Sequence, residues 1–295
     1  MAGSEWLAEG FEENRARLRG VAYRMLGSLA EADDAVQDAW LRLSRADASE
    51  VENLGAWLTT IVARVCLNVL RARNTRREQP LPVHLPDPVL GRIEEAGPEE
   101  QAVLADSVGL ALQVVLDTLP PAERLAFVLH DLFDLPFEEI APMVDRSAEA
   151  ARQLASRARR RVRGASAQAP ERDIARQRQV VDAFYAAAHR GDFDALVALL
   201  DPDVVLRSDG GTALPEATVV LRGPEAVAAR ALAVHHPDAV IHPALVNGTA
   251  GVIVTVYGQP VAVLGITISH GKIVEMDAIA DPDRVAALAA AILAD

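Results

Sequence analysis

The sequence predicts a multi-domain protein whose all-α first half, with a helix-turn-helix, is followed by an α+β domain. Three observations support this architecture. The chain has 295 residues, 51% of them hydrophobic, which is enough for more than one core. Up to residue 164, apolar residues recur at spacings of three and four, as in helices with one buried face. Beyond residue 173, β-branched runs separated by turn dipeptides indicate strands.

Three helices are expected in the first 78 residues, at 11–27, 30–45 and 53–73. The second carries an acidic front that includes Asp33, Asp34 and Asp38. The third ends in a stretch, residues 64–77, with five arginines and no acid. Charge is therefore segregated along the chain, although the protein as a whole has a formal net charge of −13.

Prolines and glycines interrupt regular structure over residues 79–99, where seven of them occur. Residues 81–106 also hold six acids against Arg92 alone. We interpret residues 79–99 as an acidic, semi-rigid linker. Helices are expected to resume at 100–118 and at 121–132, the latter beginning with Pro121, which suits the first position of a helix.

Residues 136–163 predict a helix-turn-helix with its turn at Asp145-Arg146. Ser147 is placed to cap the second helix, because its hydroxyl can accept from an unpaired N–H of the first turn. Residues 146–163 contain seven arginines and one acid, Glu149, and such a local cationic helix indicates a DNA contact. The two apolar stripes that flank the turn are Ile140, Ala141 and Val144, then Ala151, Leu154, Ala155 and Ala158.

The outward face of the second helix carries side chains that can read DNA. Arginine and glutamine make paired hydrogen bonds to guanine and adenine edges, and a trailing arginine run suits phosphates. The alternative is a merely solvated helix in an arginine-biased chain, which has 28 arginines and one lysine. The predicted outward residues are Glu149, Arg152, Gln153, Ser156, Arg157 and Arg160.

The pattern after residues 164–173 predicts the α+β domain. A helix around Val180 and Phe184 leads through the turn 189–192 to a short helix at 193–200, and an alanine-rich helix at 283–294 closes the chain. Asn247-Gly248 and His270-Gly271 predict hairpins. Consecutive antiparallel strands are expected to form a curved sheet that wraps its helices. The predicted strands are 204–207, 218–222, 239–246, 251–257, 260–269 and 272–278.

Composition excludes several classes of protein. A single cysteine, Cys66, excludes a disulfide framework and a thiolate metal cluster, and no metal or cofactor site is expected. The sequence shows no signal peptide and no uninterrupted apolar run of membrane-spanning length, so we expect a soluble, cytoplasmic protein without a membrane partner. A pI near 5.0 argues against indiscriminate nucleic-acid binding, so any DNA contact must be local.

Three stretches resemble the two conserved regions of extracytoplasmic-function (ECF) sigma factors. They are EADDAVQDAWLRL (31–43), LGAWLTTIVARVCLNVLRAR (54–73) and residues 116–162. The tail resembles a SnoaL-like domain, and the combination is similar to the SigJ-like group of these factors. The resemblance implies sigma region 2 at 1–78, the linker at 79–99, sigma region 4 at 100–164 and a cone-shaped SnoaL-like domain at 173–295. It implies promoter recognition and transcription initiation, modulated by the tail, without enzymatic activity.

The resemblance also assigns partners and residues. An acidic row would bind the β′ clamp of RNA polymerase, since carboxylates suit an arginine-rich partner; this row is Asp33, Asp34, Gln37 and Asp38. Region 4 would meet the β flap. The −10 element would be melted and held by Asn53, Trp57, Arg64, Asn68, Arg71 and Arg73, although a tryptophan at this spacing is more often a core residue than a base-stacking one. The −35 element would be read by Arg146, Ser147, Glu149, Arg152, Gln153, Ser156, Arg157 and Arg160.

Three motifs of the group have counterparts in this chain, each with at least one departure. Trp-Leu-Pro-Glu-Pro appears as His84-Leu85-Pro86-Asp87-Pro88. Asp-Gly-Gly-Gly appears as Asp209-Gly210-Gly211-Thr212. Asn-Pro-Asp-Lys-Leu appears as Asp281-Pro282-Asp283-Arg284-Val285. In the group these motifs imply regulatory contacts.

Two other classes of protein remain open from the residues alone. The tail can be an isomerase- or cyclase-type enzyme, although the chain shows no metal spacing, phosphate loop or nucleophile motif; its candidates are Tyr185, His189, Asp209, His235, His236 and Asp277. A one-component repressor with a ligand-binding tail would lack the pattern of residues 31–73 and would need a dimer. No dimerising coiled coil is indicated, so we expect a monomer. The tail's expected partner is a small molecule or the chain's own helical domains.

Overall fold

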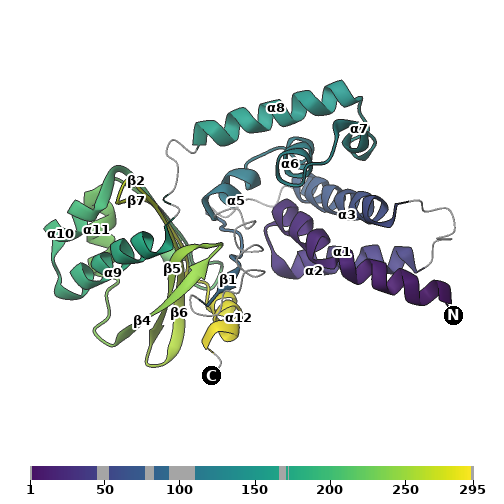
Figure 1. Ribbon diagram of the computed structural model, residues 1–295. Coiled ribbons are helices and arrows are strands. Elements are labelled where there is room, and N and C mark those ends of the chain that lie inside the picture. Colours follow the sequence, from purple (N-terminus) through teal and green to yellow (C-terminus); the bar gives the residue numbers. More distant parts are fainter. Residues whose placement is uncertain are drawn as a thin grey trace. The chain divides into compact units, whose positions relative to one another are not determined.

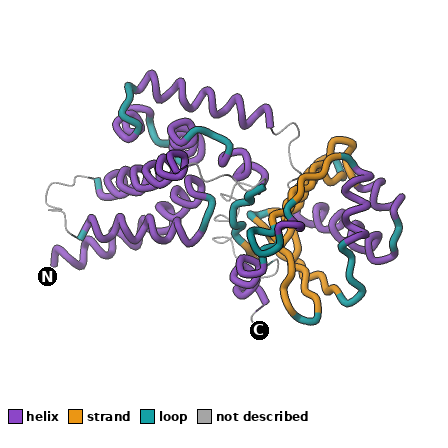
Figure 2. Tube along the Cα trace, turned by 180° about the vertical axis from the view of Figure 1, so that it is seen from behind, coloured by secondary structure: helices purple, strands orange, loops and turns teal. Residues whose placement is uncertain are grey.

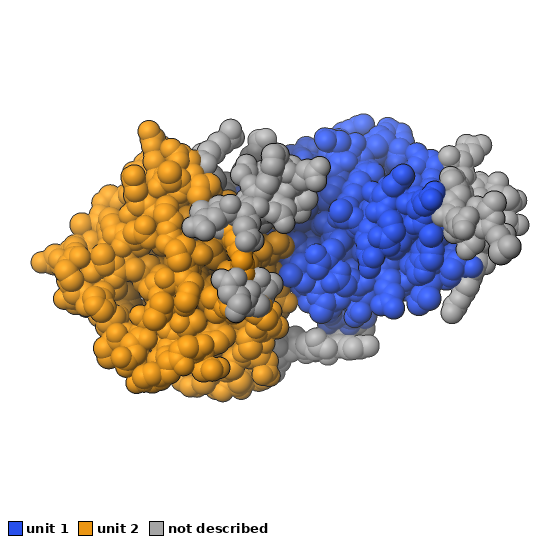
Figure 3. Space-filling view, turned by 60° about the horizontal axis from the view of Figure 1, so that its bottom comes forward, with its two compact units in different colours: residues 1–79, 113–166 blue, residues 80–112, 167–295 orange. Residues whose placement is uncertain are grey.

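The computed structural model describes residues 2–44, 53–76, 83–92, 110–165, 171 and 173–293. The chain forms two compact units, one comprising residues 1–79 and 113–166 and the other residues 80–112 and 167–295 (Figure 3). Unit 1 is helical, whereas the described strands all belong to unit 2 (Figure 2). The predicted division into an all-α part and an α+β part is confirmed.

Unit 1 begins with three helices: α1 (Ala2–Leu26), α2 (Leu29–Leu43) and α3 (Leu54–Arg76), which pack together (Figure 1). All three were expected, but α1 starts at Ala2, nine residues before the predicted residue 11. Gly27, with φ of 76°, ends α1, and Ser28 caps α2 by accepting from the N–H of Glu31. The boundary between these two helices is thus determined by residues that are close together in the sequence.

Among the described residues, one helix is long and apolar enough to cross a membrane by length and composition alone. It is the stretch Leu54–Arg73 of α3, with a mean hydropathy of 1.3. This stretch is interrupted by polar and charged residues such as Thr59, Arg64 and Asn68, so it is not the uninterrupted apolar run whose absence was noted in the sequence. Leu58, Val62 and Leu67 are buried where α3 packs on α1 and α2, as in the core helix of a bundle.

The second part of unit 1 contains α5 (Leu110–Asp117), α6 (Pro121–Phe127), a π-helical turn (Val128–Leu132), α7 (Phe137–Ile140), a 3-10 turn (Ala141–Met143) and α8 (Ala148–Ala165). The first half of the expected helix 100–118 lies outside the described residues, as does most of the expected linker. The expected helix 121–132 is α-helical only as far as Phe127. Beyond that residue the backbone hydrogen bonds join residues five apart instead of four, as in a π-helix. This changes the direction of the chain before the helix-turn-helix.

The helix-turn-helix is confirmed. Asp145 turns the chain with φ of 57°, and the Ser147 hydroxyl accepts from the N–H of Ala150 at 3.2 Å, as predicted for an N-cap. Ala151, Ala155 and Ala158 are fully buried where α8 packs against α6. Small side chains at these positions allow the two helix axes to approach closely.

A buried arginine joins the two halves of unit 1. The Nε of Arg124 on α6 donates to the carbonyl of Arg24 at 2.9 Å, and its guanidinium also pairs with Asp117. Gln113 donates to the same carbonyl at 3.3 Å. Burial lowers the pKa of Arg124, and the Asp117 carboxylate opposes this effect. The unpaired carbonyls at the end of α1 are thereby satisfied by the second half of the unit.

Unit 2 is built on a seven-stranded sheet in the order β1-β4-β5-β6-β7-β2-β3. The strands are β1 (Leu90–Gly91), β2 (Leu200–Asp209), β3 (Val219–Arg222), β4 (Ala239–Val246), β5 (Thr249–Val256), β6 (Gln259–Ser269) and β7 (Lys272–Ile279). The helices α9 (Ile174–Arg190), α10 (Phe193–Leu199) and α11 (Pro224–Ala233) lie together on one side of the sheet, while α12 (Pro282–Leu293) packs on β6 and β1 (Figure 1).

The sheet departs from the prediction in two respects. β2 pairs in parallel with β7, which follows it by some 70 residues, so the strands are not all antiparallel neighbours. The helix α11 and the short strand β1 were not predicted. Both expected hairpins are confirmed, with positive φ at Asn247-Gly248 and His270-Gly271. A third turn of this kind, Tyr257-Gly258, was missed, because tyrosine is rarely a turn residue.

Candidate functional site

The outer face of α8 and the turn that precedes it present every side chain predicted to read the −35 element. All eight are exposed: Arg146, Ser147, Glu149, Arg152, Gln153, Ser156, Arg157 and Arg160. Arg152 pairs with Glu149 at 2.8 Å, and its guanidinium lies 5.3 Å from the ring centroid of Phe137. The ring and the carboxylate hold this arginine near the start of the helix, where recognition helices contact bases.

The arginine run at the end of α8 divides into two kinds of residue. Arg157 and Arg161 both bind Glu123 of α6, at 2.9 and 2.8 Å, and Arg159 pairs with Asp131. Glu123 is buried, so these pairs brace α8 against the rest of its domain. Arg160 is exposed and makes no ion pair within the described part of the chain.

The predicted −10 residues on α3 form one stripe. Trp57, Arg64, Asn68 and Arg71 follow one another at spacings of seven, four and three, which keeps them on one helix face. The last three are exposed, while Trp57 is half-buried. Arg64 donates to the carbonyl of Pro142 at 3.3 Å. The stripe therefore offers cationic and amide groups beside one partly accessible aromatic ring.

Two other residues of the predicted −10 set have structural roles. Asn53 accepts from the N–H of Ala56 at 3.0 Å and so caps α3. Arg73 pairs with Glu31 of α2 and donates to the carbonyl of Leu26 at 3.4 Å. The role of Arg73 could not be read from the sequence, because its partners lie 42 and 47 residues earlier, whereas the Asn53 cap is local and asparagine is a common N-cap residue.

The acidic row on α2 lies beside a groove with an apolar floor. Asp33, Asp34 and Gln37 are exposed and Asp38 is partly so. The Asp33 carboxylate takes two hydrogen bonds from Arg19, at 2.6 and 3.0 Å, which raise the pKa of that guanidinium. The groove has a volume of about 470 Å³ and is lined by Ala8, Phe11, Glu12, Arg15, Arg19, Asp33, Val36, Gln37 and Trp40.

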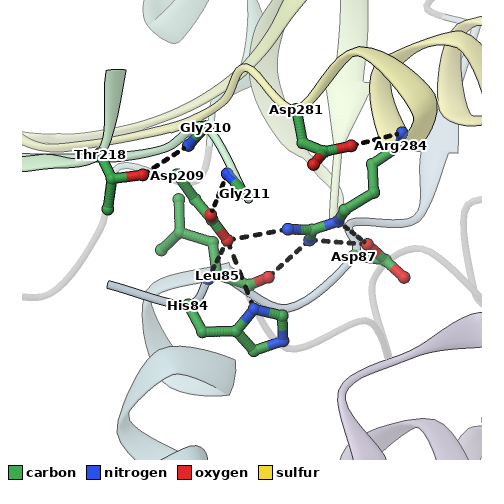
Figure 4. A network of polar contacts seen from close by, with 9 residues as sticks. All are labelled: His84, Leu85, Asp87, Asp209, Gly210, Gly211, Thr218, Asp281 and Arg284. Carbon is green, nitrogen blue, oxygen red and sulfur yellow. Dashed lines mark hydrogen bonds and ion pairs between the residues drawn. The ribbon is translucent and has the colours of Figure 1, made fainter. Parts of the chain in front are cut away.

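In unit 2 the three motifs meet at one buried carboxylate (Figure 4). Asp209 at the end of β2 has no exposed surface. Its Oδ2 accepts from the N–H of Leu85 at 2.8 Å and from Nη1 of Arg284 at 2.8 Å, and lies 3.4 Å from Nδ1 of His84. We call His84, Leu85, Asp87, Asp209 and Arg284 the linker cluster.

Arg284, on α12, is the centre of this cluster. Its Nε donates to Asp87 Oδ1 at 2.8 Å, and its Nη2 donates to the carbonyl of Leu85 at 2.6 Å. The side chain of Asp281 accepts from the N–H of Arg284 at 3.1 Å and so begins the helix that carries it. One guanidinium therefore binds the linker motif twice and the β2 motif once (Figure 4).

The cluster keeps Asp209 ionised. Burial alone raises the pKa of this carboxyl, but hydrogen bonds from His84, from the N–H groups of Leu85 and Gly211, and from Arg284 outweigh it, and the pKa lies well below its usual range. Protonation would remove the charge that Arg284 pairs with and would displace a donor from the oxygen that takes the proton. Its charge is therefore part of the fold of unit 2.

The two glycines after Asp209 are required by close packing. Gly211 has φ of 61°, and a Cβ there would lie 1.9 Å from Oδ2 of Asp281. A Cβ at Gly210 would lie 2.0 Å from the carbonyl oxygen of Leu214. A side chain at Gly211 would push the motif of β2 away from the motif that begins α12, and one at Gly210 would displace the turn that follows β2.

Residues 83–92 continue past the cluster along the sheet. The N–H of Val89 donates to Oδ1 of Asn247 at 2.6 Å, and the N–H of Asn247 returns a bond to the carbonyl of Val89 at 2.8 Å. Leu90 and Gly91 then pair with β4 as strand β1. Asn247 was predicted only as a turn residue; its contact with the linker was missed, since nothing local signals a partner 158 residues away.

Four of the six candidate residues for catalysis in the tail gather at one cavity, and the two carboxylates lie elsewhere. Tyr185, His235 and His236 line this cavity inside unit 2, and His189 meets His235 edge-to-face with 5.4 Å between ring centroids. Asp209 belongs to the linker cluster. Asp277 pairs with Arg207 at 3.1 Å and does not line the cavity; burial raises its pKa to about 6.

A three-helix domain, a helix-turn-helix domain and a cone-shaped α+β domain define a two-region sigma factor with an appended tail. The chain matches the families Sigma-70 region 2 over residues 11–76, Sigma-70, region 4 over residues 109–162 and SnoaL-like domain over residues 181–280.

The whole-chain relatives name the group. The chain is 37% identical to the ECF RNA polymerase sigma factor SigJ of Mycobacterium tuberculosis over 93% of its length and 91% of the relative's. It is 33% identical to the probable ECF RNA polymerase sigma factor SigI of the same species, over 97% of both chains. A crystal structure of M. tuberculosis SigJ superposes with a TM-score of 0.73 at 36% identity, covering 94% of this chain and 97% of that one. The protein belongs to the ECF RNA polymerase sigma factors that carry a SnoaL-like domain.

Proposed function

We propose that this sigma factor reads the −35 element with the exposed face of α8 and holds the melted −10 element along the stripe on α3. Arg152 and Gln153 are the base-reading side chains, and Arg160 anchors a phosphate. On α3, Arg64, Asn68 and Arg71 follow the strand while Trp57 flanks an unstacked base. The exposure of the whole predicted set on α8 carries this assignment.

We assign the acidic row of α2 and its apolar groove to the β′ clamp of the polymerase core, and the helix-turn-helix domain to the β flap. The exposed acids of α2 and the apolar residues of the neighbouring groove together suit a helix that presents arginines around an apolar residue. In this proposal the chain acts as a monomer in the cytoplasm, where polymerase and promoter DNA are found.

The SnoaL-like domain modulates this activity through the linker cluster in our proposal. Residues 83–92 connect in sequence to both sigma regions, and the cluster fixes them to the tail through a buried ion pair. A change in the tail that released Arg284 or Asp209 would free the linker. The tail acts here as a regulatory element, and not as an enzyme.

Run-off transcription with purified core polymerase tests the proposal. The wild-type chain is compared with Arg284→Ala and with the matched control Arg222→Ala, an exposed arginine of the same unit on β3. We expect transcripts from the wild type, which a repressor or an enzyme would not start. We expect a changed transcript yield for Arg284→Ala alone. Equal yields from all three chains would contradict modulation through the cluster, and absence of transcripts would contradict the promoter assignment.

A further inference from the structure

The SnoaL-like domain encloses a cavity of about 310 Å³ between its sheet and the helices α9 and α11. Seven of the lining residues are alanines, which leave the space open where larger side chains would fill it. Phe184, Leu206, Val227 and Met276 supply apolar walls and belong to the same buried core. The volume lies in the range of small-molecule sites.

One polar group in this apolar wall has no partner. The hydroxyl of Tyr185 on α9 is buried and makes no hydrogen bond with any described residue. An unpaired buried hydroxyl destabilises the folded state by about 1–3 kcal/mol, so protein interiors rarely contain one that has no function. Burial also raises the pKa of this phenol, which keeps it a neutral donor. The group is poised to donate a hydrogen bond that the protein itself does not accept.

The described lining of the cavity lacks the carboxylate that acid–base catalysis in a pocket of this kind typically uses. Met276 and Ala278 of β7 line it, so Glu275 and Asp277 point to the opposite side of the strand, where both bind Arg207, at 3.3 and 3.1 Å. No aspartate or glutamate occurs among its described lining residues. The site can hold a molecule, but offers no carboxylate to move a proton.

The arginine and the two histidines among the lining residues all come from one place in the chain. Arg230 lies near the end of α11, and His235 and His236 follow that helix. Arg230 and His236 are partly exposed and His235 is exposed, which places them at the solvent side of the cavity. The walls beyond them are apolar apart from Ser208 and Tyr185. A buried charge would find no counter-ion there.

We propose that the cavity binds a neutral, mostly apolar small molecule and that Tyr185 donates a hydrogen bond to a single acceptor on it, such as a ketone oxygen. Apolar contact supplies the affinity, because binding removes the apolar surfaces of the ligand and of the cavity walls from water. The hydroxyl supplies orientation, because a ligand without an acceptor would leave it unpaired. The ligand is bound and released unchanged.

The neutral naphthyl ketone prodan tests this proposal on the full-length chain. Its emission moves to shorter wavelength in apolar surroundings and to longer wavelength when its carbonyl accepts a hydrogen bond. We expect saturable binding of one equivalent. Ala231→Phe fills the cavity from α11 and should weaken binding by about tenfold or more. The matched control Ala229→Phe adds the same ring at an exposed position of the same helix and should leave the affinity within about twofold.

A second pair of variants tests the hydrogen bond without changing the cavity's shape. Tyr185→Phe should move the emission of bound prodan to shorter wavelength, whereas Tyr257→Phe, at a ring that is 75% exposed, should not. The proposal is overturned by the absence of saturable binding to the wild type, by wild-type affinity in a folded Ala231→Phe, or by unchanged emission in Tyr185→Phe. If Ala231→Phe fails to fold, the tyrosine pair decides. No polymerase is present, so the outcome is independent of the promoter assignment.

Discussion

Arg284 and Asp87 are 197 residues apart in the sequence, and Nε of Arg284 donates to Oδ1 of Asp87 at 2.8 Å. In the motifs of the group, lysine stands at the position of Arg284 and glutamate at the position of Asp87. The acid is one methylene shorter than glutamate, and the base is longer than lysine and branched at its end. The two departures thus compensate each other, and the longer arginine also reaches Asp209 and the carbonyl of Leu85.

We expect this compensation to appear as a coupling energy. Arg284→Lys should lower the stability of the SnoaL-like domain by about 2 kcal/mol, because an ammonium cannot bind three acceptors in the planar geometry of a guanidinium. Adding Asp87→Glu should restore part of that loss, since neighbouring groups in one network couple by about 0.5–3 kcal/mol. Calorimetric unfolding of the wild type, both single variants and the double variant measures the cycle. Strictly additive losses would show that the two residues do not act as a pair.

The charge on Asp209 should make the domain sensitive to acid. The folded-state pKa lies below the unfolded value of about 3.9, so its stabilisation is complete well above that value and is lost as the pH falls through the folded pKa. Asp209→Asn should lower stability at pH 7 by about 3 kcal/mol, because Arg284 loses the fully buried one of its two charge partners and keeps only Asp87. Melting curves between neutral and acid pH should have a shallower acid slope for this variant. An equal slope in both proteins would assign acid sensitivity elsewhere.

The recognition helix should lose sequence preference when Arg152 is removed. Arg152→Ala is expected to weaken binding of the polymerase holoenzyme to its promoter by about 1–3 kcal/mol and to relax the preference at one −35 position. Competition between promoter variants that differ at single −35 positions measures the preference. An unchanged −35 preference would refute direct readout by this side chain.

Arg160 should behave differently, because it makes no ion pair in the described structure, whereas the nearby Arg157 and Arg161 are both paired with Glu123. Arg160→Ala should weaken binding evenly across promoter sequences and reduce the salt dependence by about one phosphate contact. Arg159→Ala, which breaks the pair with Asp131, is the control: its main effect should be on the stability of the helix-turn-helix domain. Salt titrations of promoter binding distinguish the two. Equal salt slopes in Arg160→Ala and the wild type would remove Arg160 from the DNA contact.

Local pattern predicted most elements of this fold, and its failures have local causes. The helix-turn-helix and its Ser147 cap, and the hairpins at Asn247 and His270, follow from residues within a few positions of each other. The helix α11 was missed because its alanine-rich sequence, Pro224–Ala233, has little periodic contrast. The parallel pairing of β2 with β7 was missed because pairing across some 70 residues leaves no mark in either strand.

The candidate site shows the same division. Which residues of α8 face outward follows from the helical period, and all of them are exposed as expected. The helical period does not show which arginines remain available to DNA. Glu123 and Asp131, which lie 28 to 38 residues earlier, pair with three of them, namely Arg157, Arg159 and Arg161. Likewise Asn53 and Arg73 have the right chemistry for DNA, yet one caps a helix and the other joins two.

By itself the sequence determined the order of the domains, the helix-turn-helix and the segregation of charge, because helical period, capping and turn chemistry act over a few residues. Only the tertiary structure decided that three motifs converge on Asp209, that the arginine run is partly braced, and that an apolar cavity keeps an unpaired tyrosine. Burial is the physical reason. A charge or a hydroxyl acquires its role when water is removed from it, and which groups lose water depends on segments that are distant in the chain.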